Sequence, residues 1–219
     1  MFVKVCGITS EEDGLLAVAM DADAVGFTFA PSPRQIAPIV ARNIARRLPS
    51  DVITVGVFRD QAPERVVSVV HSAGLRAAQL HGRESPEATR YVAERVPLVI
   101  KAFSAGSPAL AEVEDYGAEV ILVDGINPGG GETFDWTLLD DLPRSHRLLL
   151  AGGLTPDNVA EAIDRVKPWG VDVATGVERH GSLTGKKDPG RVRRFVAAAR
   201  AAGPEWASEL QPDNWTEET

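Results

Sequence analysis

The chain repeats one pattern along its length, in which a short and almost wholly apolar run precedes a longer segment with apolar residues at helical spacing. Short apolar runs of this kind are typical of parallel strands that are buried on both faces. We expect strands at Phe2–Cys6, Ala24–Phe27, Ile53–Phe58, Ala77–Leu80, Leu98–Ala102, Val120–Val123, Leu148–Ala151 and Val171–Ala174.

The segments between these runs are expected to form helices, and several of them open with a proline, which is favoured in the first helical turn. The expected helices are Glu11–Met20, Val40–Leu48, Pro63–Ala73, Pro86–Arg95, Pro108–Tyr116, Pro156–Val166 and Pro189–Ala202. A weaker helical pattern lies within Trp136–Asp141. Strict alternation of strands and helices indicates a parallel sheet.

Such a sheet can lie open or close into a barrel. An open sheet usually carries a glycine-rich phosphate loop after its first strand, but Cys6–Thr9 has no such fingerprint. The polar and glycine-rich residues instead follow several strands, most densely the last three. We therefore predict an α/β fold, a single-domain TIM (β/α)8 barrel over residues 1–203, with a site at the carboxyl ends of the strands. The acidic, polar segment 204–219 is expected to be a disordered tail.

Charge and composition restrict the function. The formal net charge of −8 argues against a nucleic-acid-binding surface, although backbone N–H groups can still bind a phosphate. The single cysteine excludes an internal disulfide and fits a reducing compartment. We see neither a secretory signal nor an apolar run long enough to span a membrane, so we expect a cytoplasmic protein with no membrane partner.

Two residues at the expected carboxyl ends of strands are candidates for acid–base chemistry. Cys6 ends the first strand, and Asp124 follows the apolar run Val120–Val123. A lone cysteine is more often a small buried apolar residue, and an aspartate before a glycine is often a turn residue. Their position at the predicted catalytic end favours a functional interpretation, and apolar surroundings would help Asp124 to retain a proton.

Glycines after the last two strands point to a phosphate site. Gly152 and Gly153 follow strand seven, and Thr175 and Gly176 follow strand eight. Loops of this kind bind phosphate in many barrels, although a tight turn alone also requires glycine. Gly129–Gly131 reads as a loop that closes over substrate or as an inert linker.

Further candidates for substrate contacts are Arg34, His81 and Asp172, each near the carboxyl end of a strand. The planar fork of Arg34 suits a carboxylate or phosphate, although most arginines are simply solvated. Histidines such as His81 are more often structural hydrogen-bond partners. No group of residues has the spacing of a metal site, so we expect no metal.

In this order and at this spacing, the motifs resemble the phosphoribosylanthranilate isomerase family from Val3 to about Ala198. Each motif is weak alone, but the ordered set is specific. The matching segments are Lys4–Thr9, Ala22–Phe27, Ser32–Arg34, Val55–Phe58, Gln79–Gly82, Leu122–Asp124, Phe134–Trp136, Ala151–Leu154 and Gly176–Glu178.

The resemblance implies an Amadori rearrangement of N-(5-phosphoribosyl)anthranilate, the third step from chorismate in tryptophan biosynthesis. It implies that Cys6 is the general base, that Asp124 is the general acid, and that no cofactor is needed. Arg34 is expected to bind the anthranilate carboxylate, and the glycine loops the phosphate of this small sugar-phosphate substrate. The roles require a lowered pKa for Cys6 and a raised pKa for Asp124. Either a monomer or a homodimer is expected.

The chain departs from the family at the phosphate end, where Ala174 and Thr175 replace two usual serines. The segment from Glu178 to Asp188 is also about three residues longer than usual, judged by motif spacing. Four alternatives remain: the sister isomerase of histidine biosynthesis, a dual-substrate barrel, a non-catalytic phosphate binder, and a substrate-channelling role through the acidic tail. The first two are disfavoured because that sister family has an aspartate in the place of Cys6.

Overall fold

The computed structural model describes residues 1–125, 133–140, 142, 146–181 and 185–203. Strands and helices alternate along this part of the chain. The strands are β1 (Phe2–Val5), β2 (Ala24–Thr28), β3 (Ile53–Phe58), β4 (Ala77–Leu80), β5 (Leu98–Ser104), β6 (Val120–Asp124), β7 (Arg147–Leu150) and β8 (Gly170–Val173). The α-helices are α1 (Glu11–Ala19), α2 (Pro38–Ala45), α3 (Pro63–Ala73), α4 (Pro86–Ala93), α5 (Val159–Val166) and α6 (Pro189–Ala202). Three 3₁₀ helices are η1 (Pro108–Tyr116), η2 (Trp136–Leu139) and η3 (Thr175–Val177).

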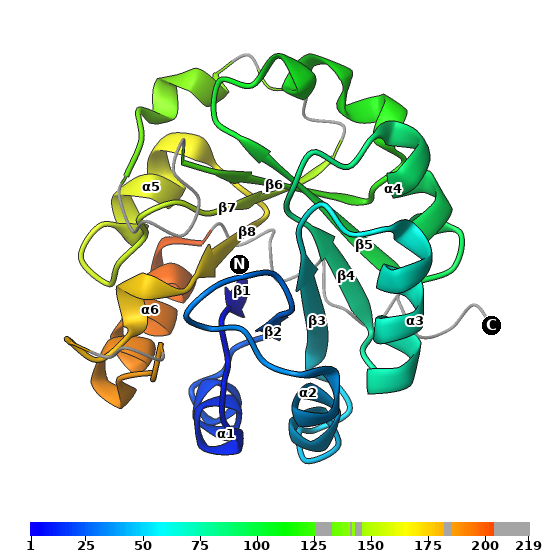
Figure 1. Ribbon diagram of the computed structural model, residues 1–219. Helices are drawn as coiled ribbons and strands as arrows, with labels where there is room; N and C mark the ends of the chain where they lie inside the picture. The colour runs from blue at the N-terminus through cyan, green and yellow to red at the C-terminus, as the bar shows by residue number, and fades with distance from the viewer. Residues whose placement is uncertain (126–132, 141, 143–145, 182–184, 204–219) are drawn as a thin grey trace.

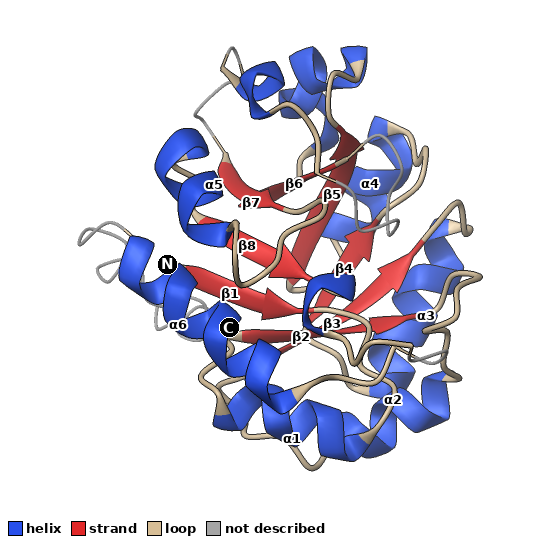
Figure 2. Ribbon diagram, turned by 90° about the vertical axis from the view of Figure 1, so that its left-hand side faces the viewer, coloured by secondary structure: helices blue, strands red, loops and turns tan. Residues whose placement is uncertain are grey.

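The strands form a closed parallel barrel. Each strand pairs with the next, and β8 pairs with β1 through the register that puts Lys4 opposite Asp172. The helices lie outside the ring of strands, as Figures 1 and 2 show. The predicted single-domain (β/α)8 barrel is therefore confirmed.

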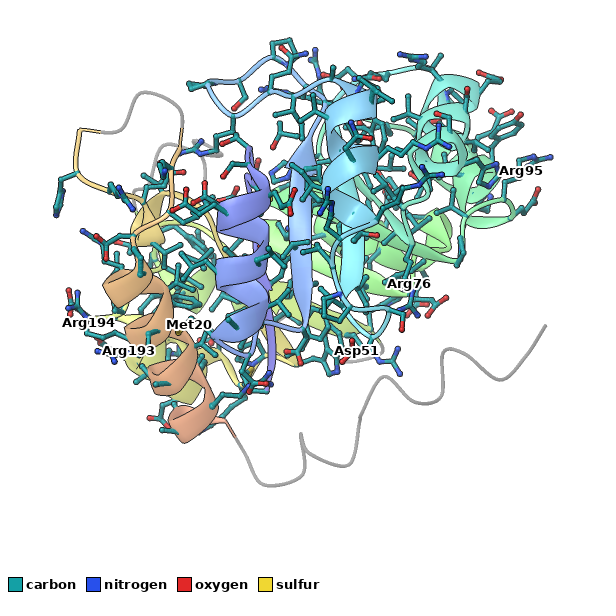
Figure 3. All side chains as sticks on the ribbon, turned by 90° about the horizontal axis from the view of Figure 1, so that it is seen from below. Met20, Asp51, Arg76, Arg95, Arg193 and Arg194 are labelled. Carbon is teal, nitrogen blue, oxygen red and sulfur yellow. The ribbon has the colours of Figure 1, made fainter. Side chains whose placement is uncertain are left out.

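The strands have apolar side chains on both faces, and successive side chains along a strand point to opposite faces. The apolar residues therefore form two layers, one inside the barrel and one outside it. One cluster includes Ile53 and Val55 of β3 and Leu122 of β6, and it fills the interior of the barrel. The larger cluster, which includes Phe58, packs between the strands and the helices. The helices turn polar faces outward: Arg193 and Arg194 of α6 are exposed and point away from the barrel (Figure 3), while Phe195 is buried.

The outer layer differs from the sequence prediction at four helices. Helix α2 covers Pro38–Ala45 in place of Val40–Leu48, and the weak pattern in Trp136–Asp141 forms the 3₁₀ helix η2. Pro108–Tyr116 has the predicted bounds but is a 3₁₀ helix, and Glu112 interrupts it with non-helical backbone angles. The helix expected from Pro156 begins only at Val159. A side-chain-stabilised turn precedes it, because the Asn158 side chain accepts from Thr155 N–H at 2.7 Å and donates to the carbonyl of Gly153 at 3.0 Å. The expected tail 204–219 lies outside the described residues, as does Gly129–Gly131.

A buried ion pair joins the loop after β4 to the outward face of β5. Lys101 Nζ lies 2.8 Å from Glu84 Oε2, and the two side chains are 2 % and 4 % exposed. Glu84 also accepts from the backbone N–H groups of Asp60 and Gly82, both at 2.9 Å. The pair therefore fixes the loops after β3 and β4 relative to β5.

Replacing Glu84 with alanine should lower the free energy of unfolding by about 3–5 kcal/mol, because it leaves the Lys101 ammonium buried without its counter-charge. Urea denaturation would measure this. Glu94→Ala is the matched control, because it removes an exposed glutamate 2.9 Å from Arg95 and should cost well under about 1 kcal/mol. Equal costs for the two variants would show that the Glu84–Lys101 pair does not hold these loops.

Candidate active site

The inward-facing positions of the strands carry polar side chains at the carboxyl end of the barrel. Below this level the same positions are mostly apolar, as at Leu122, two residues before Asp124. A cavity of about 140 Å³ is lined by Cys6, Arg34, His81, Asp124 and Asp172 among others. The structure thus brings together five predicted site residues that come from five different strands or the loops that follow them.

A larger cavity of about 440 Å³ lies over the ends of β4 and β5 and shares Arg59 and His81 with the first. Its other lining residues include Arg83 and Ser104, and neither Cys6 nor Asp124 lines it. We place the candidate site at the smaller cavity, because only there do a thiol and a carboxyl meet.

Cys6 is buried, with 8 % of its surface exposed. Gly26 on the adjacent β2 makes room for it: a Cβ at Gly26 would lie 2.6 Å from Cys6 Sγ and 3.3 Å from Lys4 Cε. Burial raises the pKa of the thiol, although the positive charges of Lys4 and Lys187 act to lower it. The pKa of Cys6 is therefore raised and not lowered as expected, because desolvation and the charge of Asp172 outweigh the nearby cations.

Asp124 ends β6 and has a neighbour at each carboxylate oxygen. Oδ1 accepts from the backbone N–H of Gly125 at 2.7 Å, and Oδ2 lies 3.4 Å from His81 Nε2. The other ring nitrogen of His81 lies 2.7 Å from the amide nitrogen of Gln79. His81 is therefore a neighbour of the candidate acid and is itself oriented by Gln79.

Arg34 extends from the loop after β2 to the end of β8. Its Nε lies 2.5 Å from Glu178 Oε1, and its Nη2 donates to Glu178 Oε2 at 3.1 Å and to Thr175 Oγ1 at 2.8 Å. Hydrogen bonding to Glu178 raises the pKa of Arg34, so the guanidinium stays charged. Gly7 and Gly185 leave space for its side chain, since a Cβ on either would lie within 2.8 Å of Arg34 carbons.

The loops after β7 and β8 meet around a second cavity of about 50 Å³, lined by Gly152, Gly153, Thr175 and Gly176 among others. Gly152 and Gly153 have φ angles of +87° and +62°, a region that favours glycine. A side chain on Gly176 would collide with the carbonyl group of Leu154. The predicted phosphate-binding residues therefore line one small cavity, and Asp124 and Asp172 also border it.

Several polar residues of the site were missed in the sequence. Lys4 and Lys187 are wholly buried and belong to ion pairs with Asp172 and Glu178. Burial by itself would raise the pKa of Glu178, but the hydrogen bond from Arg34 and the charge of Lys187 lower it. A signal for Lys4 existed: it is a charged residue inside an otherwise apolar strand, two positions before Cys6.

A thiol and a carboxyl at the carboxyl end of a closed barrel, beside a glycine-lined cavity, are typical of a barrel enzyme that moves protons on a phosphorylated substrate. The described residues contain no group of His, Cys, Asp and Glu that could hold a metal ion. None of the helices in this part of the chain is long and apolar enough to cross a membrane.

Comparison with known proteins identifies the family. The family model described as N-(5'phosphoribosyl)anthranilate (PRA) isomerase matches residues 3–198, so the chain belongs to that family. A relative named N-(5'-phosphoribosyl)anthranilate isomerase, from Desulforudis audaxviator, is 48 % identical over 207 residues, which cover 91 % of this chain and 98 % of the relative.

Two solved structures agree with this result. The phosphoribosyl anthranilate isomerase of Thermus thermophilus has a TM-score of 0.85 and 43 % identity, and the match covers 92 % of this chain and 99 % of that one. A second structure of such an isomerase holds reduced 1-(o-carboxyphenylamino)-1-deoxyribulose 5-phosphate. It has a TM-score of 0.80 and 42 % identity, with the same coverage of 92 % and 99 %.

Replacing Gly26 with alanine should lower kcat about 10²-fold, because the new methyl group would displace the Cys6 sulfur. Steady-state kinetics would measure this, with the melting temperature recorded for both variants. Gly190→Ala on α6 is the control, because its Cβ would meet only Asp188 Oδ1, at 3.3 Å. An unchanged kcat in Gly26→Ala would remove Gly26, and the close packing of Cys6 against it, from the catalytic geometry.

Proposed function

We propose that this chain converts N-(5-phosphoribosyl)anthranilate into 1-(2-carboxyphenylamino)-1-deoxyribulose 5-phosphate, with Cys6 as general base and Asp124 as general acid. The isomerase activity rests on the family membership and on the relatives named above. The residue roles are supported by one observation: Cys6 and Asp124 line the same cavity at the catalytic end of the barrel.

The first step opens the sugar ring. Asp124 donates a proton to the ring oxygen as the bond between that oxygen and C1 breaks, and the lone pair of the substrate nitrogen forms a Schiff base. Asp124 is placed to do this by the N–H of Gly125 and by His81, which borders its second oxygen. Protonation of the leaving oxygen avoids a free alkoxide and so lowers the barrier.

The second step removes the proton from C2. The Cys6 thiolate accepts it, and the electron pair of the C–H bond moves toward the protonated imine to give an enolamine. Tautomerisation of the enolamine yields the ketone. The substrate nitrogen serves as the electron sink, so the reaction requires no cofactor.

Binding of the two charged ends of the substrate follows the same geometry. The phosphate would be bound by backbone groups of Gly152, Gly153 and Gly176 with Thr175, which line the small cavity. Arg34 would bind the anthranilate carboxylate, since the contacts described for it use Nε and Nη2 and the remaining donor is Nη1. His81 and Asp172 would contact the sugar between these ends.

Location and assembly are further parts of the proposal. A single cysteine and a substrate of amino-acid biosynthesis favour the cytoplasm. The functional unit is a monomer or a homodimer, and the negative net charge disfavours a nucleic-acid partner.

Cys6→Ser and Asp124→Asn should each lower kcat about 10²- to 10⁴-fold, because each removes one proton-transfer group. The assay follows the loss of fluorescence of freshly prepared phosphoribosylanthranilate, with circular dichroism to show that both variants fold. Near-normal turnover by either variant would reassign that role. No turnover by folded wild-type protein would refute the substrate.

Arg34→Ala should mainly raise KM for phosphoribosylanthranilate, because it removes the proposed partner of the carboxylate. Arg47→Ala is the control, because Arg47 is exposed and lies 3.8 Å from Glu11 on the outer helices. The same fluorescence assay gives kcat and KM for both variants. If KM is as low in Arg34→Ala as in Arg47→Ala, Arg34 pairs with Glu178 for structural reasons alone.

A further inference from the structure

Three lysines are buried in the described part of the chain, and their hydrogen bonds distinguish them. The ammonium of Lys101 has four acceptors: the carbonyl oxygens of Leu80, Gly82 and Ala102, and Glu84 Oε2. Lys4 Nζ donates to Asp172 Oδ1 at 2.9 Å and interacts with the side chain of Cys6. An ammonium carries three N–H donors, so Lys4 retains donors that Lys101 has used.

The backbone aims Lys4 toward Cys6. The two residues are separated by two positions on β1 and its extension, so their side chains leave the same face of the strand and point into the barrel. The surroundings of Gly26 give a second indication that the Lys4 and Cys6 side chains lie close together. The Cβ that Gly26 lacks would touch both Cys6 Sγ and Lys4 Cε, so the sulfur and the end of the lysine side chain occupy adjacent space.

We propose that Lys4 is a positioning residue of this site: its ammonium stabilises the thiolate form of Cys6, and Asp172 limits that effect by neutralising part of the ammonium's charge. The proposal rests on the proposed function, in which Cys6 must act as a thiolate. It adds a role for a residue that acts on the reaction through Cys6. Lys101, which points to the outer face of the sheet, has no such role.

The other charged groups near Cys6 do not replace Lys4. Lys187 is wholly buried but donates to Glu178 Oε1 and to the carbonyl of Ala174, both at 3.2 Å. Burial lowers the pKa of Lys187. For Lys4, burial also acts to lower the pKa, but the interactions with Asp172 and Cys6 together outweigh it and raise that pKa. Arg34 is paired with Glu178.

The remaining titratable groups around the cavity are on other strands. Asp124 and His81 line it and contact each other, at 3.4 Å. Lys4 is therefore the one buried cation on the same strand face as the thiol, among the residues described.

The test measures the ionisation of Cys6 in the ligand-free protein, through the pH dependence of its alkylation by iodoacetamide, followed by mass spectrometry. Cys6 is the only cysteine, so the signal has a single source. Lys4→Met should lower the alkylation rate about tenfold or more at neutral pH and move the midpoint upward, because an adjacent unit charge shifts a pKa by one unit or more. Lys101→Met is the matched control and should leave the midpoint unchanged.

Asp172→Asn should shift the midpoint the other way. Asparagine retains an oxygen that can accept from Lys4 Nζ but removes the negative charge, so alkylation at neutral pH should become several-fold faster. Opposite shifts in Lys4→Met and Asp172→Asn identify a charge effect, because general loosening of the barrel would move both variants in one direction.

Shifts of the same sign, or a Lys4→Met midpoint equal to that of Lys101→Met, would overturn the proposal. If Lys4→Met does not fold, the test rests on Asp172→Asn. An alkylation midpoint of Asp172→Asn equal to or above that of the wild type would then overturn the proposal. No substrate is used, so these outcomes do not depend on whether phosphoribosylanthranilate is the substrate.

Discussion

The pairing of β8 with β1 is the constraint on which the site depends. It closes the barrel, and its register puts Lys4 opposite Asp172, so that a buried ion pair lies inside the ring at the point where the sheet joins itself. A shift of β1 by one residue would turn Lys4 and Cys6 to the outer face, so that Lys4 would lose Asp172 and the thiol would face the helices. The chemistry at the mouth of the barrel therefore follows from the way the barrel closes.

Burial and charge oppose each other at this point. A base that removes a carbon-bound proton benefits from a dry surrounding, but the same dryness disfavours the thiolate and raises the pKa of Cys6. Two buried cations lie near the Cys6 sulfur and oppose this effect, and each is paired with a carboxylate: Lys4 with Asp172, and Lys187 with Glu178. Pairing makes burial of the lysines tolerable, and it also weakens the field that they exert on the sulfur.

The fold could be predicted from the sequence because its signals are local. Each strand is an apolar run next to a polar loop, and the structure places most of their ends within a residue of the predicted ones. The start of α5 could not be predicted this way, because the Asn158 side chain holds the preceding turn. The residues at strand ends were found for the same local reason. The ion pairs of these residues could not be predicted, because Lys4 and Asp172 are 168 positions apart and neither local segment indicates the partner of its charged residue.

The glycines of the loops after β7 and β8 do not by themselves indicate a phosphate site. Gly152 has a left-handed backbone, and a Cβ on it would lie 2.6 Å from Gly125 N, so these turns require glycine with or without a ligand. What favours phosphate is that the loops after β7 and β8 touch and enclose a small cavity. Thr175 stands where the family usually has a serine, and it keeps a hydroxyl group. That hydroxyl accepts a hydrogen bond from Arg34. That contact joins the proposed phosphate end of the site to the proposed carboxylate end through the Arg34 side chain.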